Sequence, residues 1–486
     1  MVFSSLLFVY AFFPLNLLFY WLMPDLQRKN RVMLIFSLIF YAWAGPPYLL
    51  LLVGMTFADW VVTKAMATCE EQSRRKRWLV IGCVINLGLL GIFKYLTFIL
   101  QNVHNLFGIP HNVVSIALPI GISFYTFQLL SYMVDVYRRD VEAQQSFFTL
   151  LLYVSMFHQC IAGPIVRYEH VERELTNRKM LLPDVTYGIR RFTIGLAKKA
   201  LLANTCGSYA DTFLAVTGAG TDPATIYSTL VGQPALSVWL GMFAYTMQIY
   251  LDFSAYSDMA IGMGRMIGFH YRENFNYPYI SRSITEFWRR WHISLSSFFR
   301  DYLYIPLGGN RCDVHRHITN LLIVWALTGF WHGASWNFLF WGLYYFLFLV
   351  GEKYLFSKWL SSAPRVLTRV YTILVFSFGW MIFRFETLGQ VFAVLRGLFG
   401  LNGNGFTNYE TNVALQSSFI FFIVAILACT PVIKAFGEWL RDRALTDRGA
   451  QIVMQISTIA TPALLLIVST AALVGDSYNP FLYFRF

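Results

Sequence analysis

The amino-acid sequence predicts an all-α, polytopic membrane protein. Of its 486 residues, 57% are hydrophobic and 18% aromatic, whereas only 13% are charged, roughly half the charged share of a soluble globular domain. Apolar stretches of about 20 residues, the length that crosses a bilayer as a helix, recur along the whole chain. We expect about 11–12 transmembrane or re-entrant helices, which form one membrane domain over residues 1–486.

The first hydrophobic regions are separated by a turn signal. Segment 2–23 has no basic residues ahead of it and no small-residue cleavage site, so we expect a retained spanning helix rather than a signal peptide. Gly45-Pro46-Pro47 interrupts the next region and predicts a tight hairpin between spans 31–44 and 48–67. The next two predicted spans are 78–99 and 116–136.

Segment 147–163 is too short and irregular for a simple crossing. It contains His158 and ends in Ala162-Gly163-Pro164, which favours a re-entrant or tilted helix. Non-helical backbone at membrane depth must be surrounded by protein or water, so such breaks indicate an internal cavity. The remaining predicted spans are 186–214, 235–262, 319–350, 366–386, 414–434 and 451–475.

The net charge of +12 comes from basic clusters between the apolar stretches. The clusters at 28–31, 74–77, 138–139 and 173–179 follow successive hairpins and would lie on one side, which the positive-inside rule assigns to the cytoplasm. The arginine-rich stretch 265–316 is then the largest cytoplasmic element, with amphipathic helices in the interface. This distribution indicates contact with anionic membrane lipids and no nucleic-acid partner.

The cysteines and the short motifs argue against several other classes of protein. The six cysteines are scattered without a C-x-x-C pair, which predicts neither a disulfide framework nor a zinc site. Cys312, His315 and His317 are close in sequence, but their spacing matches no strong zinc pattern and their loop is basic, so we expect no metal site. The sequence has no Walker A loop, no G-x-S-x-G elbow and no H-E-x-x-H motif, and therefore gives no support for ATP hydrolysis.

His332 is the first candidate catalytic residue. It lies in the middle of predicted span 319–350, between Gly329 and Gly333. Ionisable side chains at this depth are costly and commonly functional, and the two glycines permit close helix approach or a broken helix. An imidazole with a pKa near neutrality can take a proton from an attacking hydroxyl or thiol. The alternative is a packing histidine, hydrogen-bonded between helices.

His292 is the second candidate, in Ser283-Ile-Thr-Glu-Phe-Trp-Arg-Arg-Trp-His-Ile-Ser-Leu-Ser296. This stretch is a plausible amphipathic helix, on which Trp288 and His292, four residues apart, would be neighbours. The guanidinium groups of Arg289 and Arg290 would match phosphates in bidentate fashion. The alternative is an interfacial helix whose Trp and Arg side chains only contact lipid headgroups.

Two acids lie in the otherwise apolar segment 248–258. Asp252 and Asp258 are six residues apart and would not face each other on a helix, which argues against a carboxylate pair of glycosidase type. We expect them to be structural partners of neighbouring arginines or helix caps.

Long motifs occur in order along nearly the whole chain, in segments 161–168, 248–258, 274–279, 285–292, 299–311, 329–336 and 479–486. Together they resemble the membrane-bound O-acyltransferase (MBOAT) family. Within that family the resemblance is to the bacterial branch of alginate O-acetyltransferase membrane subunits and D-alanyl transfer proteins. It implies a helical membrane protein around a central funnel or tunnel, with His332 as the essential histidine of the family and His292 as its second histidine.

The function implied by this resemblance is O-acetyl transfer to an exported polysaccharide, alginate or another exopolysaccharide. Cytosolic acetyl-CoA would be the acyl donor, with no permanently bound cofactor. The protein would be a multi-pass protein of the bacterial inner membrane, where it would act with a periplasmic or membrane-anchored acetyltransferase of SGNH type. His332 would act as general base or form an acyl-imidazole, and His292 would position the donor or shuttle a proton. The expected acetyl-CoA-binding residues are Trp288, Arg289, Arg290 and Arg300.

Other functions stay open at the level of sequence. A peptidoglycan O-acetylation subunit would look much the same, and a non-enzymatic polysaccharide or acyl transporter, or a scaffold, would also place polar residues in the membrane. The aromatic tail after span 451–475 is expected to fold back into an apolar groove or the funnel mouth. There Tyr483 would accept an acetyl group and pass it to the partner, or the tail would only plug or anchor the bundle.

Overall fold

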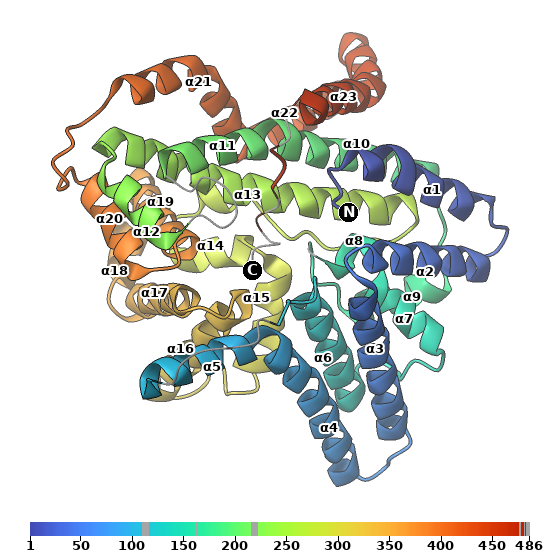
Figure 1. Cartoon of the computed structure of the whole chain (residues 1–486). Helices are drawn as coiled ribbons and strands as arrows, with labels where there is room; N and C mark the ends of the chain where they lie inside the picture. The colour runs from blue at the N-terminus through green and yellow to red at the C-terminus, as the bar shows by residue number, and fades with distance from the viewer. Residues whose placement is uncertain (109–115, 162, 215–221, 476–477, 481, 483–486) are drawn as a thin grey trace. The chain divides into compact units, whose positions relative to one another are not determined.

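Helices make up all the regular structure of the computed structural model, which describes residues 1–108, 116–161, 163–214, 222–475, 478–480 and 482 (Figure 1). Over these residues there is no β-strand, so the predicted all-α class is confirmed. The chain divides into two compact units, and the long helices α10 (Leu182–Ala197) and α13 (Ala235–Met266) contribute residues to both.

The first unit comprises Met1–Phe192, Tyr256–Glu273 and Arg300–Tyr302. Its first helical stretch starts with the π-helical segment Phe8–Phe12 and ends at Leu22, so it is shorter than the predicted span 2–23. The other π-helical segment before α5 is Gly91–Tyr95. The helices are α1 (Phe13–Leu22), α2 (Leu26–Ala42), α3 (Pro46–Ala67), α4 (Gln72–Leu90), α5 (Leu96–Phe107), α6 (Ile122–Arg138), α7 (Phe147–Ser155), α8 (Phe157–Cys160) and α9 (Tyr168–Thr176).

The predicted hairpin between α2 and α3 is confirmed. Helix α2 ends at Ala42, and α3 begins at Pro46, where the missing N–H of proline is tolerated in the first turn. Gly45 lies between them with a φ of 143°, which a side chain would strain. Farther along, buried Asp59 of α3 accepts hydrogen bonds from Asn86 of α4 at 2.7 and 2.9 Å, so polar contacts also join these two helices.

Segment 147–163 is short and broken, as the sequence predicts. Helix α7 ends at Ser155, Met156 leaves the helical conformation with a ψ of 114°, and α8 is a single turn. His158 in this turn is fully buried, and its Nδ1 lies 2.8 Å from the hydroxyl of Tyr271.

The second unit comprises Thr193–Ala255, Asn274–Phe299 and Leu303–Phe486. The prediction of one span over 319–350 is wrong, because the helix ends at His332 and a second helix begins at Trp336. The helices are α11 (Asn204–Phe213), α12 (Pro223–Val231), α14 (Ile284–Arg290), α15 (Ile293–Phe299), α16 (Val314–His332), α17 (Trp336–Tyr354), α18 (Ser357–Ser362), α19 (Arg365–Arg384), α20 (Leu388–Leu398), α21 (Tyr409–Ala428), α22 (Val432–Arg443) and α23 (Arg448–Gly475).

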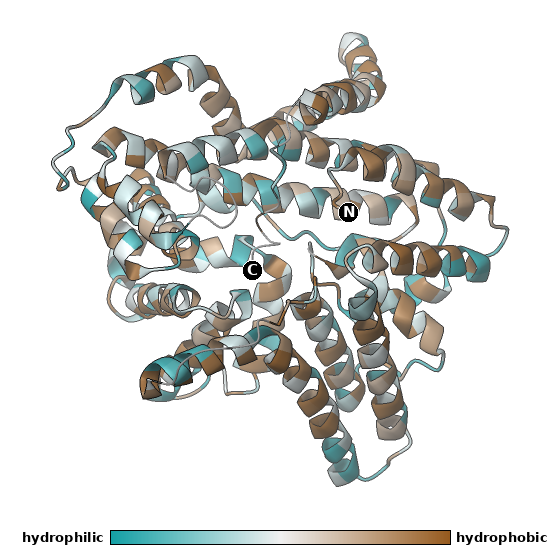
Figure 2. Ribbon diagram, in the orientation of Figure 1, coloured by the Kyte–Doolittle hydropathy of each residue, from teal (hydrophilic) through white to brown (hydrophobic). Residues whose placement is uncertain are grey.

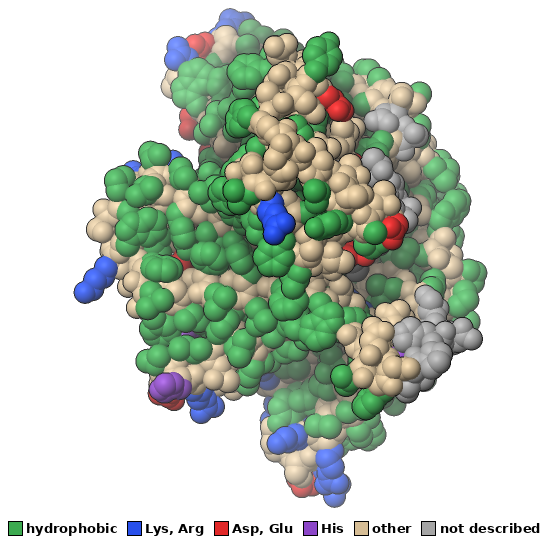
Figure 3. Space-filling view, turned by 60° about the vertical axis from the view of Figure 1, so that its left-hand side comes forward, with side chains coloured by type: hydrophobic (Ala, Val, Ile, Leu, Met, Phe, Trp, Pro, Cys, Tyr) green, Lys and Arg blue, Asp and Glu red, His purple; other side chains and the backbone are tan. Residues whose placement is uncertain are grey.

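Five of the described helices are long and apolar enough to cross a bilayer: Pro46–Ala67, Gln72–Phe107, Arg365–Arg384, Tyr409–Ala428 and Arg448–Gly475. Their hydropathy is visible in Figure 2, where α3 and α4 are largely apolar and the loop that joins them is hydrophilic. Hydrophobic side chains also cover most of the face in Figure 3. The chain is therefore a multi-pass membrane protein, although fewer described helices are clear crossings than predicted. Several other predicted spans are divided by helix ends or, like α13, contain polar side chains.

Candidate functional site

The hairpin of α16 and α17 places His332 at its turn. A Cβ added at Gly329 would clash with the carbonyl oxygen of Phe338, and one added at Gly342 would clash with the carbonyl oxygen of Trp325. Only glycine permits this close approach of the two helices. Helix α16 ends at His332, and the extended Gly333 turns the chain toward α17. The glycines around His332 therefore serve close helix packing and a helix break, the two roles that the sequence suggests.

The His332 side chain lies among aromatic rings. Its ring centroid is 4.9 Å from those of Trp331 and Trp341 and 5.2 Å from that of Phe383, with the rings nearly perpendicular in each case. The residue is 5% exposed. The imidazole thus lies in a water-poor, apolar site, where a reacting group would be protected from solvent.

His292 lies at a break between two helices, so the predicted continuous amphipathic helix over 283–296 is wrong. Helix α14 ends at Arg290, α15 begins at Ile293, and His292 between them has a φ of 44°, in the left-handed region. The backbone of Asn274 accepts a hydrogen bond from the N–H of Ile293 at 2.9 Å, and Asn276 donates to the carbonyl of Arg290 at 2.9 Å. These long-range contacts hold a conformation that an isolated helix would not adopt, and backbone strain of this kind is common at functional sites.

The hydrogen bonds of Asn274 determine which nitrogen of His292 carries the proton. The Oδ1 atom of Asn274 accepts from the N–H and the hydroxyl of Ser294 at 3.3 and 2.9 Å, so it is an acceptor. The Nδ1 atom of His292, 3.1 Å away, must therefore donate to it. In a neutral imidazole this leaves Nε2 with its lone pair, and Nε2 is buried with no hydrogen-bond partner among the described residues.

Burial favours the neutral form of the His292 imidazole, and one indole ring contacts both histidines. His292 is 1% exposed, and loss of solvation lowers its pKa below the usual value. Its ring lies 4.8 Å from that of Phe253 and 5.9 Å from that of Trp331, the residue that also contacts His332. The structure thus brings the two predicted histidines to one indole, which the sequence did not predict. Trp331 and Asn274 are the residues that sequence reasoning left without a role.

The predicted acetyl-CoA-binding residues have different surroundings. Trp288 is buried, with its ring 4.8 Å from those of Trp325 and Tyr345. Arg289 is exposed on α14, and Arg290 forms an ion pair with Glu286 at 2.9 Å. Arg300 is exposed and pairs with Asp301 at 2.6 Å; both residues belong to the first unit. The role of all four residues in binding remains a prediction.

The two acids of segment 248–258 form ion pairs with basic residues, in agreement with a structural role. Asp258 pairs with Arg191 at 2.6 Å in the first unit, and Asp252 pairs with Lys199 at 2.8 Å in the second. The partner of Asp252 is thus a lysine rather than the expected arginine. Both side chains of the Lys199–Asp252 pair are almost fully buried, at 4% and 2% exposed.

The described part of the tail, residues 478–480 and 482, is held by charged groups of the second unit, of which Lys199 and Asp252 are buried. The N–H of Leu482 donates to Asp252 at 2.9 Å, and Lys199 donates to the carbonyl of Pro480. The hydroxyl of Tyr478 donates to Asp211 at 2.5 Å. The tail therefore folds back onto the protein through polar groups rather than through an apolar groove alone. Tyr483, the predicted acyl acceptor, lies outside the described residues.

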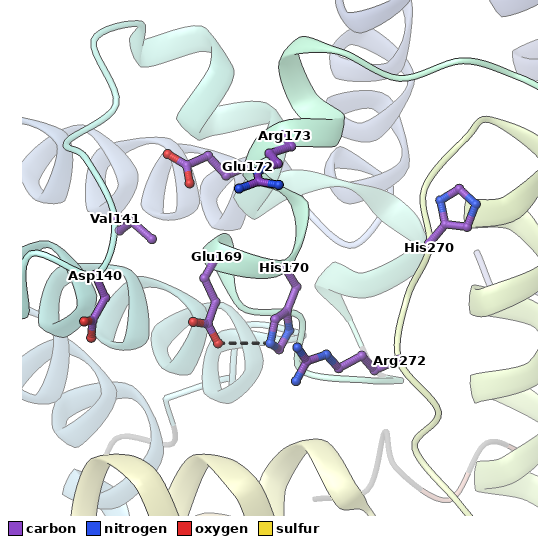
Figure 4. A pocket seen from close by; sticks show the side chains of 8 residues that line it. All are labelled: Asp140, Val141, Glu169, His170, Glu172, Arg173, His270 and Arg272. Carbon is purple, nitrogen blue, oxygen red and sulfur yellow. Dashed lines mark ion pairs between the residues drawn. The ribbon is translucent and has the colours of Figure 1, made fainter.

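A polar pocket of about 450 Å³ lies in the first unit (Figure 4). Figure 4 shows the imidazole of His170 between the carboxylate of Glu169, to which it is ion-paired at 3.0 Å, and the guanidinium of Arg272. Burial and the positive charge of Arg272 together lower the pKa of His170, although Glu169 opposes this. Three carboxylates outnumber two guanidinium groups here, so the pocket lacks the excess positive charge that a polyphosphate needs. Its lining residues are Asp140, Val141, Glu169, His170, Glu172, Arg173, His270 and Arg272.

Metal coordination has no candidate among the residues that the structure describes. No group of three or more His, Cys, Asp or Glu side chains there is placed to hold an ion. His317 is instead hydrogen-bonded to the hydroxyls of Tyr304 and Tyr354 at 2.9 and 2.8 Å. Its nitrogens are thus engaged by phenols, which fits packing better than metal binding.

Comparison with known proteins identifies a family whose sequence pattern this chain matches. The model of the membrane-bound O-acyltransferase family (MBOAT) matches residues 94–392, which include both histidine motifs. The probable alginate O-acetylase AlgI of Azotobacter vinelandii is 37% identical, with both chains covered completely. The peptidoglycan O-acetyltransferase of Helicobacter pylori is 34% identical over 83% of this chain and 80% of its own. The teichoic acid D-alanyltransferase of Bacillus subtilis is 29% identical over 56% of this chain and 70% of its own.

Proposed function

Because the chain belongs to the membrane-bound O-acyltransferase family, we propose that it moves acetyl groups from cytosolic acetyl-CoA across the inner membrane for O-acetylation of an exported polysaccharide. The observation that carries the proposal is the pair of buried imidazoles, His292 and His332, on one indole. Relatives named for alginate and for peptidoglycan support a polysaccharide as the final acceptor. The hydroxyls of an alginate-like polymer are the first choice, because that relative aligns over its whole length.

In the proposed reaction, acetyl-CoA is a substrate and no resident cofactor takes part. His332 removes the proton of an acceptor hydroxyl, whose oxygen attacks the thioester carbonyl. The carbon–sulfur bond breaks, an oxygen ester forms, and the coenzyme A thiolate takes up the proton from the imidazolium. A thioester is already activated, so the exchange needs no ATP. The open Nε2 of His292, which can only accept a hydrogen bond in this tautomer, positions the donor or relays the proton.

The proposal assigns further roles to residues of the cytoplasmic side and the tail. Arg289, Arg290 and Arg300 bind the phosphates of coenzyme A, and Trp288 supports the pantetheine path from within its aromatic cluster. Tyr483 receives the acetyl group and passes it to a separate SGNH-type acetyltransferase outside the membrane. The Tyr483→Phe variant tests this relay, because it keeps the ring and removes only the hydroxyl. Full polymer acetylation in that variant would show that Tyr483 has no part in transfer.

Reconstitution tests the reaction and its direction. The purified protein in liposomes, with acetyl-labelled acetyl-CoA added on the outside, should release free coenzyme A and label an acceptor hydroxyl only when the arginine-rich face is outward. Orientation is read from single cysteines placed within 74–77, near 290 and at 220, of which the first two should share a side. Release of coenzyme A equal to that of empty liposomes would contradict the enzymatic proposal. Transport of intact polymer without acetyl transfer would instead establish the transporter alternative.

A second reconstitution tests the partner. Addition of the SGNH-type protein should move label from the membrane protein to added polysaccharide. Polymer acetylation by this chain alone, at the same rate as with the partner, would make the partner unnecessary.

A further inference from the structure

Glu352 is a buried carboxylate that the proposed reaction does not use. It lies in the last turn of α17 and is 4% exposed. A carboxylate in such surroundings is costly unless donors surround it. Among the residues that the structure describes, its contacts are four hydrogen bonds with N–H and O–H groups rather than an ion pair with lysine or arginine.

Three of these four donors belong to the first turn of α14. The Oε1 atom accepts from the N–H of Ile284 at 2.5 Å, and Oε2 accepts from the N–H and the hydroxyl of Thr285 at 2.9 and 2.7 Å. The hydroxyl of Tyr371 donates the fourth, at 3.3 Å. The first N–H groups of a helix have no acceptor within the helix. Glu352 supplies acceptors for two of them, the N–H groups of Ile284 and Thr285.

This contact joins the two elements that carry the histidines. Helix α14 ends two residues before His292, and α17 begins four residues after His332. Between these ends, Trp288 of α14 packs on Trp341 and Tyr345 of α17, with ring centroids 5.5 and 4.8 Å apart. Hydrogen bonds at one end and ring packing along the length therefore determine how α14 lies on α17.

We infer that Glu352 is a positioning residue, which fixes His292 relative to His332 by holding the first turn of α14 on the last turn of α17. The inference concerns the placement of these residues, and its catalytic consequence rests on the proposed function. A side chain here must accept from every neighbour, because all four contacts are donors. A carboxylate can do so with two oxygens, whereas a glutamine amide has one oxygen and would turn its NH₂ group toward another donor.

Glu352→Gln therefore tests the inference, since it conserves the size of the side chain and replaces one of its two acceptor oxygens with an NH₂ donor. We expect kcat for acetyl transfer to fall by about 100-fold, the effect of a displacement near 1 Å at a reacting group. KM for acetyl-CoA should rise as well, because Trp288, Arg289 and Arg290, the proposed coenzyme A contacts, lie on the same helix. Glu352→Asp, which keeps both oxygens on a shorter side chain, should recover part of kcat. Tyr371→Phe is the matched control, which removes one donor to Glu352 and leaves α14 untouched.

Hydrogen–deuterium exchange of the purified full-length protein measures the placement directly. Peptides that cover 284–292 should exchange faster in Glu352→Gln than in the wild type and in Tyr371→Phe, whereas peptides of α3 and α4 should not change. Unchanged exchange at 284–292 would overturn the inference, and so would faster exchange with wild-type kcat. If wild-type protein transfers no acetyl group, the proposed function fails, and the exchange measurement still decides whether Glu352 holds α14.

Discussion

The polar pocket of the first unit and the aromatic site of the second each contain two histidines, but their surroundings differ. His170 and His270 lie against the carboxylates of Glu169 and Glu174, at 3.0 and 2.7 Å. His292 has an amide and a hydroxyl as its side-chain hydrogen-bond partners, and both it and His332 lie among aromatic rings. A carboxylate partner occupies a nitrogen of the imidazole, whereas a desolvated site with one oriented nitrogen preserves a lone pair for reaction. Three of the four predictions below test this difference, and the other tests the Lys199–Asp252 pair beneath the tail.

The largest effect is expected from removal of His332. His332→Ala should lower acetyl transfer by about 100- to 10,000-fold, the usual contribution of a general base. His270→Ala, which removes a histidine from the polar pocket, should keep transfer within about twofold of the wild type. The measurement is acetate content of the exported polymer, normalised to the amount of protein in the membrane. Normal acetate content in His332→Ala would exclude a catalytic role for this histidine.

Asn274 tests whether the orientation of His292 matters as well as its presence. Asn274→Ala removes the acceptor that fixes the tautomer, and we expect a loss of about 10- to 100-fold in kcat, as for other residues that orient a reactive imidazole. Asn274→Asp should instead introduce a pH dependence. A carboxylate favours the imidazolium and raises the pKa of His292, which burial lowers in the wild type.

The direction of this pH dependence follows from the protonation state of the imidazole that reacts. Only a neutral imidazole can accept a proton, and His332 is the same in both proteins, so a difference between their pH profiles comes from His292. The Asn274→Asp variant should therefore lose activity at a higher pH than the wild type as the pH falls from 8 to 6, in membranes assayed with labelled acetyl-CoA. Parallel pH profiles for the two proteins would show that Asn274 does not tune His292.

The sequence locates the two histidines of this site but not their geometry. The all-α class, the turn at Gly45 and the two histidine motifs follow from composition, backbone preferences and long motifs. The break at His292 does not, because the local sequence is compatible with a helix and the left-handed conformation depends on backbone contacts with Asn274 and Asn276. The Lys199 contact with the tail is equally non-local, since hundreds of residues separate the partners. The one indication in the sequence was that Lys199 lies within the predicted span 186–214, where a lysine needs a partner.

The buried Lys199–Asp252 pair is expected to have an intermediate effect. Lys199→Ala leaves the carboxylate of Asp252 buried without its cation, which should destabilise the second unit by about 3–5 kcal/mol. It also removes a donor to Pro480, so the tail should become more accessible. Lys198→Ala is the matched control, because Lys198 is the adjacent lysine and its ammonium group donates to the hydroxyl of Ser254 at 3.4 Å. Thermal unfolding and protease cleavage of a tag after residue 486 measure both effects. Equal stability and cleavage in the two variants would show that the pair does not hold the tail.

The smallest effect is expected at His170, where the ion pair with Glu169 lies beside Arg272. Burial and Arg272 lower the pKa of His170 in the folded protein, so the unfolded chain binds its proton more readily. The contribution of this group to stability is therefore complete above about pH 6.5 and decreases as the pH falls toward the lower, folded-state pKa. The glutamine in His170→Gln does not titrate. Below pH 6.5 the unfolding temperature of the wild type should therefore fall relative to that of this variant. Acetyl transfer at pH 7.5 should stay within about twofold, because the proposed reaction uses no residue of the polar pocket. A loss of transfer as large as that in His332→Ala would mean that the polar pocket, and not only the aromatic site, takes part in the chemistry.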